Sequence, residues 1–67
     1  MRSWNTVKAY FGKHANVHLA DGAVIVNVQV EKDPNLKHIV LLKGPTKTWI
    51  VPFENILYFD AVGETNV

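Results

Sequence analysis

Three histidines are the first residues of this chain that could do chemistry. His14 and His18 are separated by three residues, but Gly12 precedes them and His18 lies in an alternating pattern typical of a strand. His38 falls in a different predicted strand. The chain has no Cys and no carboxylate at metal-ligand spacing from these histidines. We therefore predict no metal site and interpret the histidines as solvated residues on strand faces.

Catalysis has no candidate machinery in this sequence. Ser3 is the only serine and is expected to cap a helix, while Asp21, Asp33 and Asp60 fall at turns or on a strand with no base nearby. No Gly-rich phosphate loop is present. Because no nucleophile–base or acid–base pair can be named, we predict a binding or assembly role, with no enzymatic activity, no cofactor and no small-molecule substrate.

The most polar patch of the chain has two interpretations. It consists of Lys32, Asp33, Asn35, Lys37 and His38. As an RNA-binding loop, it would use lysine on phosphates, Asp and Asn on base edges, and His38 for stacking. As an ordinary solvated turn, it would contain the residues that turns favour. The residues alone leave both interpretations open.

Length and composition indicate one small folded domain over residues 1–67. Hydrophobic residues make up 48% and charged residues 19%, and the formal net charge is +1. A chain of this size has a marginal core of its own, and without Cys it has no disulfides to supplement that core. Residues 1–10 lack the continuous apolar core expected of a signal peptide, and no apolar run approaches the length of a membrane span. We predict a cytoplasmic location and no membrane partner.

The apolar pattern predicts one helix followed by five strands. Trp4, Val7 and Phe11 form a helical stripe, with Gly12 as the stop, so the helix is expected over about 4–11. Turn residues then separate strands expected at about 15–20, 23–31, 37–43, 48–52 and 56–62. Residues 1–2 and 63–67 are predicted as loose ends.

The first two strands form the hairpin around which the rest is organised. Asp21-Gly22 joins them, and we predict a positive φ at Gly22 because a tight turn requires it. Alternation in the second strand predicts a single core-facing wall made of four valines: Val24, Val26, Val28 and Val30. Five short, twisted antiparallel strands can curl into a small, partly open barrel. The predicted fold class is all-β with a short N-terminal helix.

From about Trp4 to Val62 the chain resembles the Sm-like family, which includes the LSm proteins and the bacterial Hfq RNA chaperone. The similarity lies in the helix and five strands, in V-H-L-A-D-G at 17–22, in H-I-V-L-L-K-G at 38–44 and in V-P-F-E-N-I at 51–56. It implies a strongly bent five-stranded, SH3-type barrel, assembly into a ring, and binding of single-stranded, often U-rich RNA. It also implies that the Asp33–His38 loop and the corner of Phe53, Glu54 and Asn55 face the RNA.

The chain departs from the family pattern at three places. Asn27 stands where the family prefers a glycine at the bend of the second strand. The loop at 32–35 lacks the family's aromatic residue, and Phe53-Glu54-Asn55 replaces its Arg-Gly or Lys-His. Phe53 is either a stacking platform or a buried corner residue. The alternatives to RNA binding are a protein-binding or scaffold ring that has lost the RNA site, and, more distantly, a small enzyme.

Two segments near the C-terminal end are apolar on both faces, which a single small core cannot cover. We expect them to form the contacts of a homo-oligomeric ring of more than two subunits, with the fourth strand of one subunit paired to the fifth strand of the next. The predicted interface residues are Trp49, Ile50, Val51, Ile56, Leu57, Tyr58 and Phe59.

Overall fold

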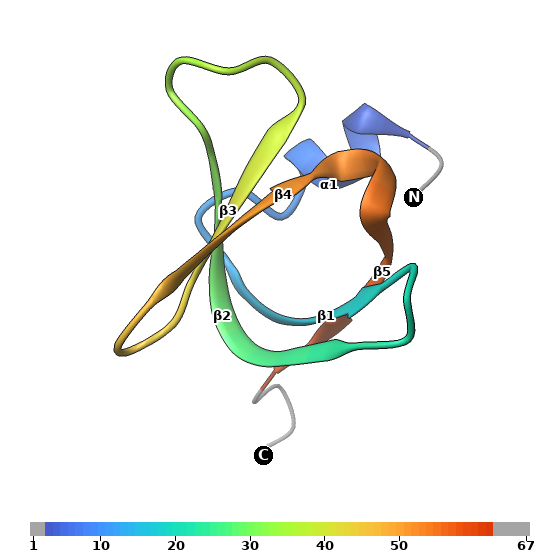
Figure 1. Ribbon diagram of the computed structural model, residues 1–67, viewed down its shortest axis with the longest axis vertical. Coiled ribbons are helices and arrows are strands. Elements are labelled where there is room, and N and C mark those ends of the chain that lie inside the picture. The colour runs from blue at the N-terminus through green and yellow to red at the C-terminus, as the bar shows by residue number, and fades with distance from the viewer. Residues whose placement is uncertain (1–2, 63–67) are drawn as a thin grey trace.

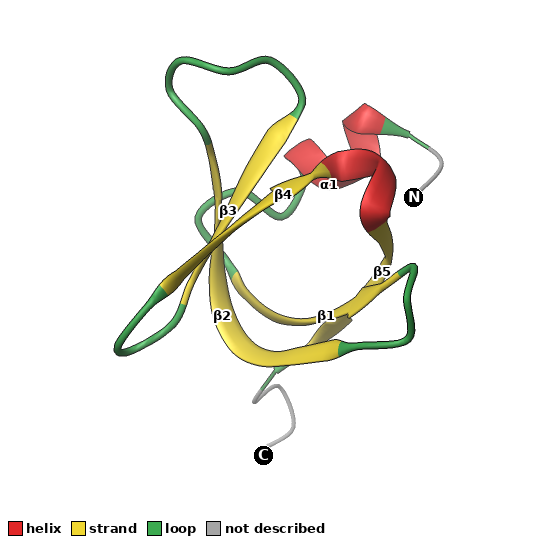
Figure 2. Cartoon of the chain, viewed as in Figure 1, coloured by secondary structure: helices red, strands yellow, loops and turns green. Residues whose placement is uncertain are grey.

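The computed structural model describes residues 3–62, which form one helix and a single open antiparallel sheet (Figures 1 and 2). The elements are α1 (Trp4–Lys8), β1 (His14–Leu19), β2 (Val24–Lys32), β3 (Ile39–Lys43), β4 (Thr48–Pro52), the 3-10 helix η1 (Phe53–Asn55) and β5 (Ile56–Ala61). The strand order is β4-β3-β2-β1-β5, which makes β4 and β5 the two edges. The predicted order of one helix and five strands is confirmed. The predicted loose ends lie outside the described residues.

Helix α1 is shorter than the predicted span. The Ser3 side chain accepts a hydrogen bond from the Asn5 backbone N–H at 3.1 Å, which confirms Ser3 as the N-cap. The α-helix ends at Lys8 and not near Phe11, because the next amides bond three residues back: Tyr10 to Val7 and Phe11 to Lys8. No helix among residues 3–62 has the length and apolar character needed to cross a bilayer.

Strand β2 bends sharply along its length (Figure 1). Asn27, in the middle of the strand, is its one residue with positive φ. Asn27 has φ +53°, and its backbone N–H donates to the Asn16 side-chain oxygen at 2.8 Å. The β1–β2 register shifts by one residue at this point, as a bulge requires. Asparagine is a residue type that tolerates positive φ, so Asn27 can occupy this left-handed position.

The bulge overturns the prediction of a four-valine wall. Val28 and Val30 are buried, but Val24 and Val26 are exposed and Ile25 takes the inward position between them. One extra residue in a strand exchanges the faces of every side chain beyond it. The prediction assumed an uninterrupted period of two through Asn27.

The core fills the concave side of the curved sheet. Fully buried side chains come from α1 and from every strand except β4, which contributes the buried Val51: Val7, Val17, Val28, Val30, Val40, Leu42 and Ile56. The turn after α1 closes one side of it, because the Tyr10 ring stacks on Phe59 with ring centroids 4.4 Å apart. The Gly12 amide also donates to the Val30 carbonyl at 2.7 Å, which ties this turn to β2.

The β1–β2 turn has the predicted backbone. Gly22 has φ +95°, its N–H donates to the Leu19 carbonyl at 3.0 Å, and Asp21 accepts a hydrogen bond from the Ala23 N–H at 2.9 Å. This is a three-residue turn with glycine in the left-handed position, one residue longer than the tightest hairpin.

We expect Gly22→Val to destabilise the fold by roughly 1–3 kcal/mol, because a β-branched residue is strained at this φ. A Cβ at Gly22 would contact nothing within 4 Å, so the loss would come from backbone strain and not from a clash. Gly22→Asn is the matched control, since Asn tolerates positive φ, and it should lose less. Urea denaturation measures both, and an unchanged midpoint for Gly22→Val would contradict the strained turn.

Candidate nucleic-acid interface

The β2–β3 loop is organised by the Asp33 carboxylate. One of its oxygens accepts hydrogen bonds from the backbone N–H groups of Asn35, at 2.8 Å, and Leu36, at 2.9 Å. The Asp33 N–H donates to the Ile39 carbonyl at 3.1 Å, which closes the base of the loop. Lys32 donates from Nζ to the Asp33 carbonyl at 2.8 Å. Two residues predicted to contact RNA, Lys32 and Asp33, therefore hold the loop itself.

Hydrogen bonds from the backbone amides of Asn35 and Leu36 lower the pKa of the Asp33 carboxyl below its ordinary value of 3.8. Because the pKa is lower in the folded state, the stabilisation is fully present above about pH 4. It is lost as the pH falls through the folded-state pKa.

We expect Asp33→Asn to reduce the acid sensitivity of folding. The wild-type free energy of unfolding should fall more between about pH 5 and about pH 2 than that of the variant. Urea midpoints at the two pH values measure this difference. Glu54→Gln is the control, because it also removes one carboxylate, and Glu54 accepts no hydrogen bond among residues 3–62. Equal pH dependence of Asp33→Asn and wild type would contradict the role assigned to Asp33.

The corner formed by η1 meets the end of this loop. The Phe53 N–H donates to the His38 carbonyl at 3.0 Å, and the two rings lie 5.1 Å apart. The Trp4 ring of α1 contacts both, with its centroid 4.9 Å from that of His38 and 5.3 Å from that of Phe53. The Phe11 ring packs against Trp4, with a distance of 5.7 Å between the ring centroids. We call Trp4, Phe11, His38 and Phe53 the aromatic cluster. It brings together the two predicted RNA-contacting segments, which are separated along the chain.

His38 was expected within the third strand, but in the structure it lies in the turn just before β3. Its φ is +61°, a left-handed conformation outside the range of a regular strand. This turn leaves the His38 side chain exposed at the rim of the aromatic cluster, while Phe53 and Trp4 are half-buried. Phe53 packs against the core and also contacts the exposed His38 ring.

The remaining predicted site residues are exposed around this rim: Asn35, Lys37, Glu54 and Asn55. Since Lys32 is bonded to the loop, Lys37 is the cation of the patch without a hydrogen-bonded partner among residues 3–62. The negative charge of Glu54 offsets part of the positive charge of the patch. The patch therefore offers one lysine and one exposed ring, with no strong positive potential.

The predicted interface residues divide into two groups. Val51, Ile56 and Phe59 are buried in the core of the chain itself, and Trp49 is half-buried, with Lys47 Nζ 4.7 Å from its ring centroid. Ile50, Leu57 and Tyr58 are exposed on the edge strands. Leu57 is the extra residue where the β1–β5 register shifts, so it and Tyr58 are exposed side by side. These three are the exposed members of the predicted interface.

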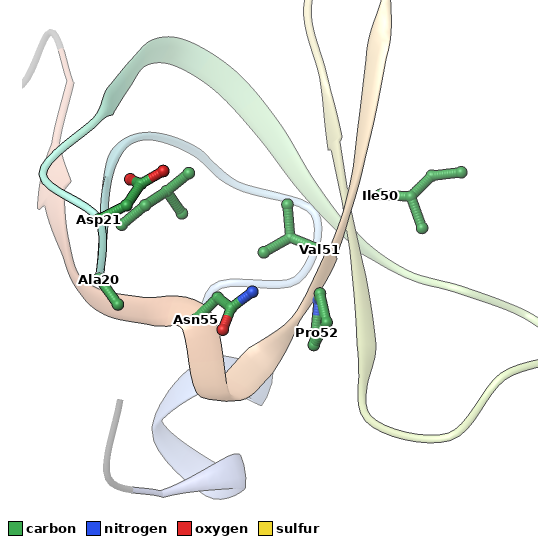
Figure 3. Close-up of a pocket in the computed structure, with 7 residues that line it drawn as sticks. Ala20, Asp21, Ile50, Val51, Pro52 and Asn55 are labelled. Atoms are coloured by element: carbon green, nitrogen blue, oxygen red, sulfur yellow. The ribbon is translucent and has the colours of Figure 1, made fainter.

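A cavity of about 230 Å³ borders the unpaired edge of β4 (Figure 3). Figure 3 shows Val51 pointing into it and Ile50 pointing away. Its other walls are the β1–β2 turn and Asn55. The Ala20 N–H donates to the Asn55 carbonyl at 2.7 Å, which joins this turn to η1.

The other two histidines lie apart from this rim. His18 Nε2 lies 2.8 Å from an Asp60 carboxylate oxygen, and its ring stacks on Tyr58 at 4.1 Å. His14 is exposed at the start of β1. No group of three potential ligands gathers at one point within residues 3–62.

Trp4 and Phe11 belong to the aromatic cluster, although neither is among the site residues predicted from the sequence. In the sequence they are only two residues of the helical stripe. The sequence carries no local signal for the contact of Trp4 with His38, which lies 34 positions later, because that contact depends on how α1 docks on the sheet.

No family model, no curated protein and no solved structure matches the chain.

Proposed function

We propose that this chain is a non-catalytic, Sm-like subunit that binds single-stranded RNA and assembles into a homo-oligomeric ring. The observation that carries the proposal is the junction of the β2–β3 loop with the η1 corner through the His38–Phe53 contacts. Single-stranded RNA is recognised by stacking unpaired bases on aromatic rings beside groups that contact phosphate and base edges. An exposed His38, with Lys37 and Asn35 in the same loop and Asn55 in the η1 corner, offers these groups.

The strand order and curvature support a barrel of the Sm-like kind. The bend of β2 at Asn27 folds the sheet over its own core, and the two edge strands β4 and β5 are left without partners among residues 3–62. Pairing β4 of one subunit with β5 of the next would satisfy both edges and cover Ile50, Leu57 and Tyr58. The cavity beside β4 would then lie at the boundary between subunits.

The second candidate is a ring that binds protein instead of RNA. The observation that favours it is the chemistry of the rim, where Asp33 accepts hydrogen bonds from backbone amides and Glu54 is an exposed carboxylate. The two candidates differ in their response to salt, because phosphate contacts release counterions and protein contacts of a neutral surface do not.

We expect the wild-type chain to bind oligo-U more tightly than duplex DNA, because the bases must be unstacked to reach the rim. Lys37→Ala should weaken binding to oligo-U and oligo-A alike and reduce the slope of log K against log salt by about 1, as loss of one phosphate contact does. Fluorescence anisotropy over a salt series measures both effects.

Lys47→Ala is the matched control, since it removes the same charge at the β3–β4 turn, away from the rim. An equal loss in both variants would indicate a general charge effect and not a contact by Lys37. Absence of binding to every oligonucleotide at low salt would favour the scaffold ring.

A further inference from the structure

A second polar cleft lies at the other end of β3 from the candidate RNA rim. It is a pocket of about 350 Å³ between the start of β1, the bend of β2 and the beginning of the β3–β4 turn. In Figure 1 that turn and the β2–β3 loop project at opposite ends of the β3–β4 pair. The pocket is lined by His14, Asn27, Gln29, Lys43, Gly44 and Pro45.

The strand register places the polar side chains of this pocket in one row. His14 of β1 stands opposite Gln29 of β2, which in turn stands opposite Lys43 of β3. Side chains directly opposite one another on neighbouring strands have Cβ atoms about 5 Å apart. The Gln29 amide is therefore flanked by the His14 imidazole on one side and by the Lys43 ammonium on the other.

Every side chain in the row can donate a hydrogen bond, and no carboxylate among residues 3–62 lines the pocket. Gln29 Nε2 donates to the Gly12 carbonyl at 3.5 Å, which leaves the second N–H of this amide for a ligand. Lys43 forms no ion pair among residues 3–62, and the nearest acidic residue of β2, Glu31, stands in a different row opposite Leu41. The lining therefore carries the positive charge of Lys43 although the whole chain is close to neutral.

Asn27 contributes an amide from a position where glycine would be the less strained residue. Its φ is +53°, and its backbone N–H is satisfied by Asn16, which leaves its own side chain to line the pocket. Strained, non-glycine residues of this kind concentrate at binding sites. Two amides and two cationic or donor side chains around one concave space suit a tetrahedral oxyanion.

We propose that this pocket binds a phosphate group, held by Lys43 and His14 with the side-chain amides of Asn27 and Gln29. The phosphate is either a small phosphate or a backbone phosphate of a nucleic acid strand. The proposal does not depend on RNA binding at the rim, because it uses none of the rim residues.

The test is an NMR titration with inorganic phosphate, in which chloride is exchanged for phosphate at constant ionic strength to exclude screening effects. We expect saturable shifts of the His14 ring and of the Asn27 and Gln29 side-chain amides, with the Asn35 and Asn55 amides of the rim unmoved. Asn27→Gly keeps the backbone conformation and removes one amide, so it should weaken binding severalfold without unfolding the chain. Lys43→Gln should weaken it roughly tenfold.

Lys37→Gln is the control of equal charge change, and it should bind phosphate like the wild type. Shifts that drift without saturating, or an equal loss in Lys37→Gln and Lys43→Gln, would overturn the proposal. A parallel titration with oligo-U identifies the source of the phosphate. If the same signals shift at a lower concentration of oligo-U than of inorganic phosphate, the pocket binds a nucleic acid strand. If they shift with inorganic phosphate but not with oligo-U, the pocket binds a small phosphate.

Discussion

Light scattering is expected to give the wild-type chain a mass of more than two subunits and the Tyr58→Pro variant the mass of a monomer. Tyr58 lies on β5, at the edge of the sheet, opposite His18 of β1. Proline removes a backbone donor, and its ring interferes with a strand that pairs alongside. Continuation of the sheet into the next subunit through β5 should therefore fail.

The reason to expect a ring is the apolar surface at both edges. Ile50 on β4 is 67% exposed, and Leu57 and Tyr58 on β5 are each 48% exposed, beside strand edges with unpaired backbone groups. Such edges are a hazard unless another strand covers them. A contact of β4 with β5 of the next copy is head-to-tail, and contacts of this kind close into rings when the rotation permits. Burial of this surface would also add to the marginal core of a 67-residue chain.

A second substitution separates loss of assembly from loss of folding, because proline in β5 could also weaken the β1–β5 pairing. Ile50→Lys changes only an exposed side chain on the β4 edge, where charge opposes strand pairing. Val26→Lys is its matched control: Val26 is 66% exposed, like Ile50, but it lies on β2 inside the sheet. We expect Ile50→Lys to dissociate the ring and Val26→Lys to leave it intact. A folded wild-type monomer at micromolar concentration would contradict both the ring and the Sm-like assignment.

The strand boundaries were predictable because they depend on local chemistry. Proline cannot donate to a strand ladder, and Asp-Gly and Gly-Pro pairs favour turns. Residues of these kinds each lie in or beside a connection of the structure: Asp21-Gly22, Pro34, Gly44-Pro45 and Pro52. The Ser3 cap and the sign of φ at Gly22 follow from the same short-range rules. Alternation of apolar residues then located the strands to within one or two residues.

The inward and outward faces of β2 were not predictable from alternation. They depend on a hydrogen bond between Asn16 and Asn27, eleven residues apart, which stabilises the bulge. The end of α1 and the contact of Trp4 with His38 have the same origin in tertiary packing. By contrast, the structural role of Asp33 could have been predicted, since an Asp that bonds amides two and three residues on is a common turn feature.

Removal of the His38 ring should have the largest effect on RNA binding of any single change at the rim. His38 is exposed, and its ring is held against Trp4 and Phe53, so a base could stack on it with little further loss of side-chain freedom. Stacking of one base on an aromatic side chain contributes about 1–3 kcal/mol by alanine substitution. His38→Asn should therefore weaken binding of oligo-U by about 5- to 150-fold.

Two variants are needed because His38 has φ +61° and many replacements would strain the backbone. Asn and Gly both tolerate this conformation and both lack an aromatic ring. We expect His38→Asn and His38→Gly to lose the same affinity in fluorescence anisotropy while their urea midpoints stay near that of the wild type. If both variants bind oligo-U like the wild type, no base stacks on His38. The β2–β3 loop is then a solvated turn, and the scaffold ring becomes the better account of the chain.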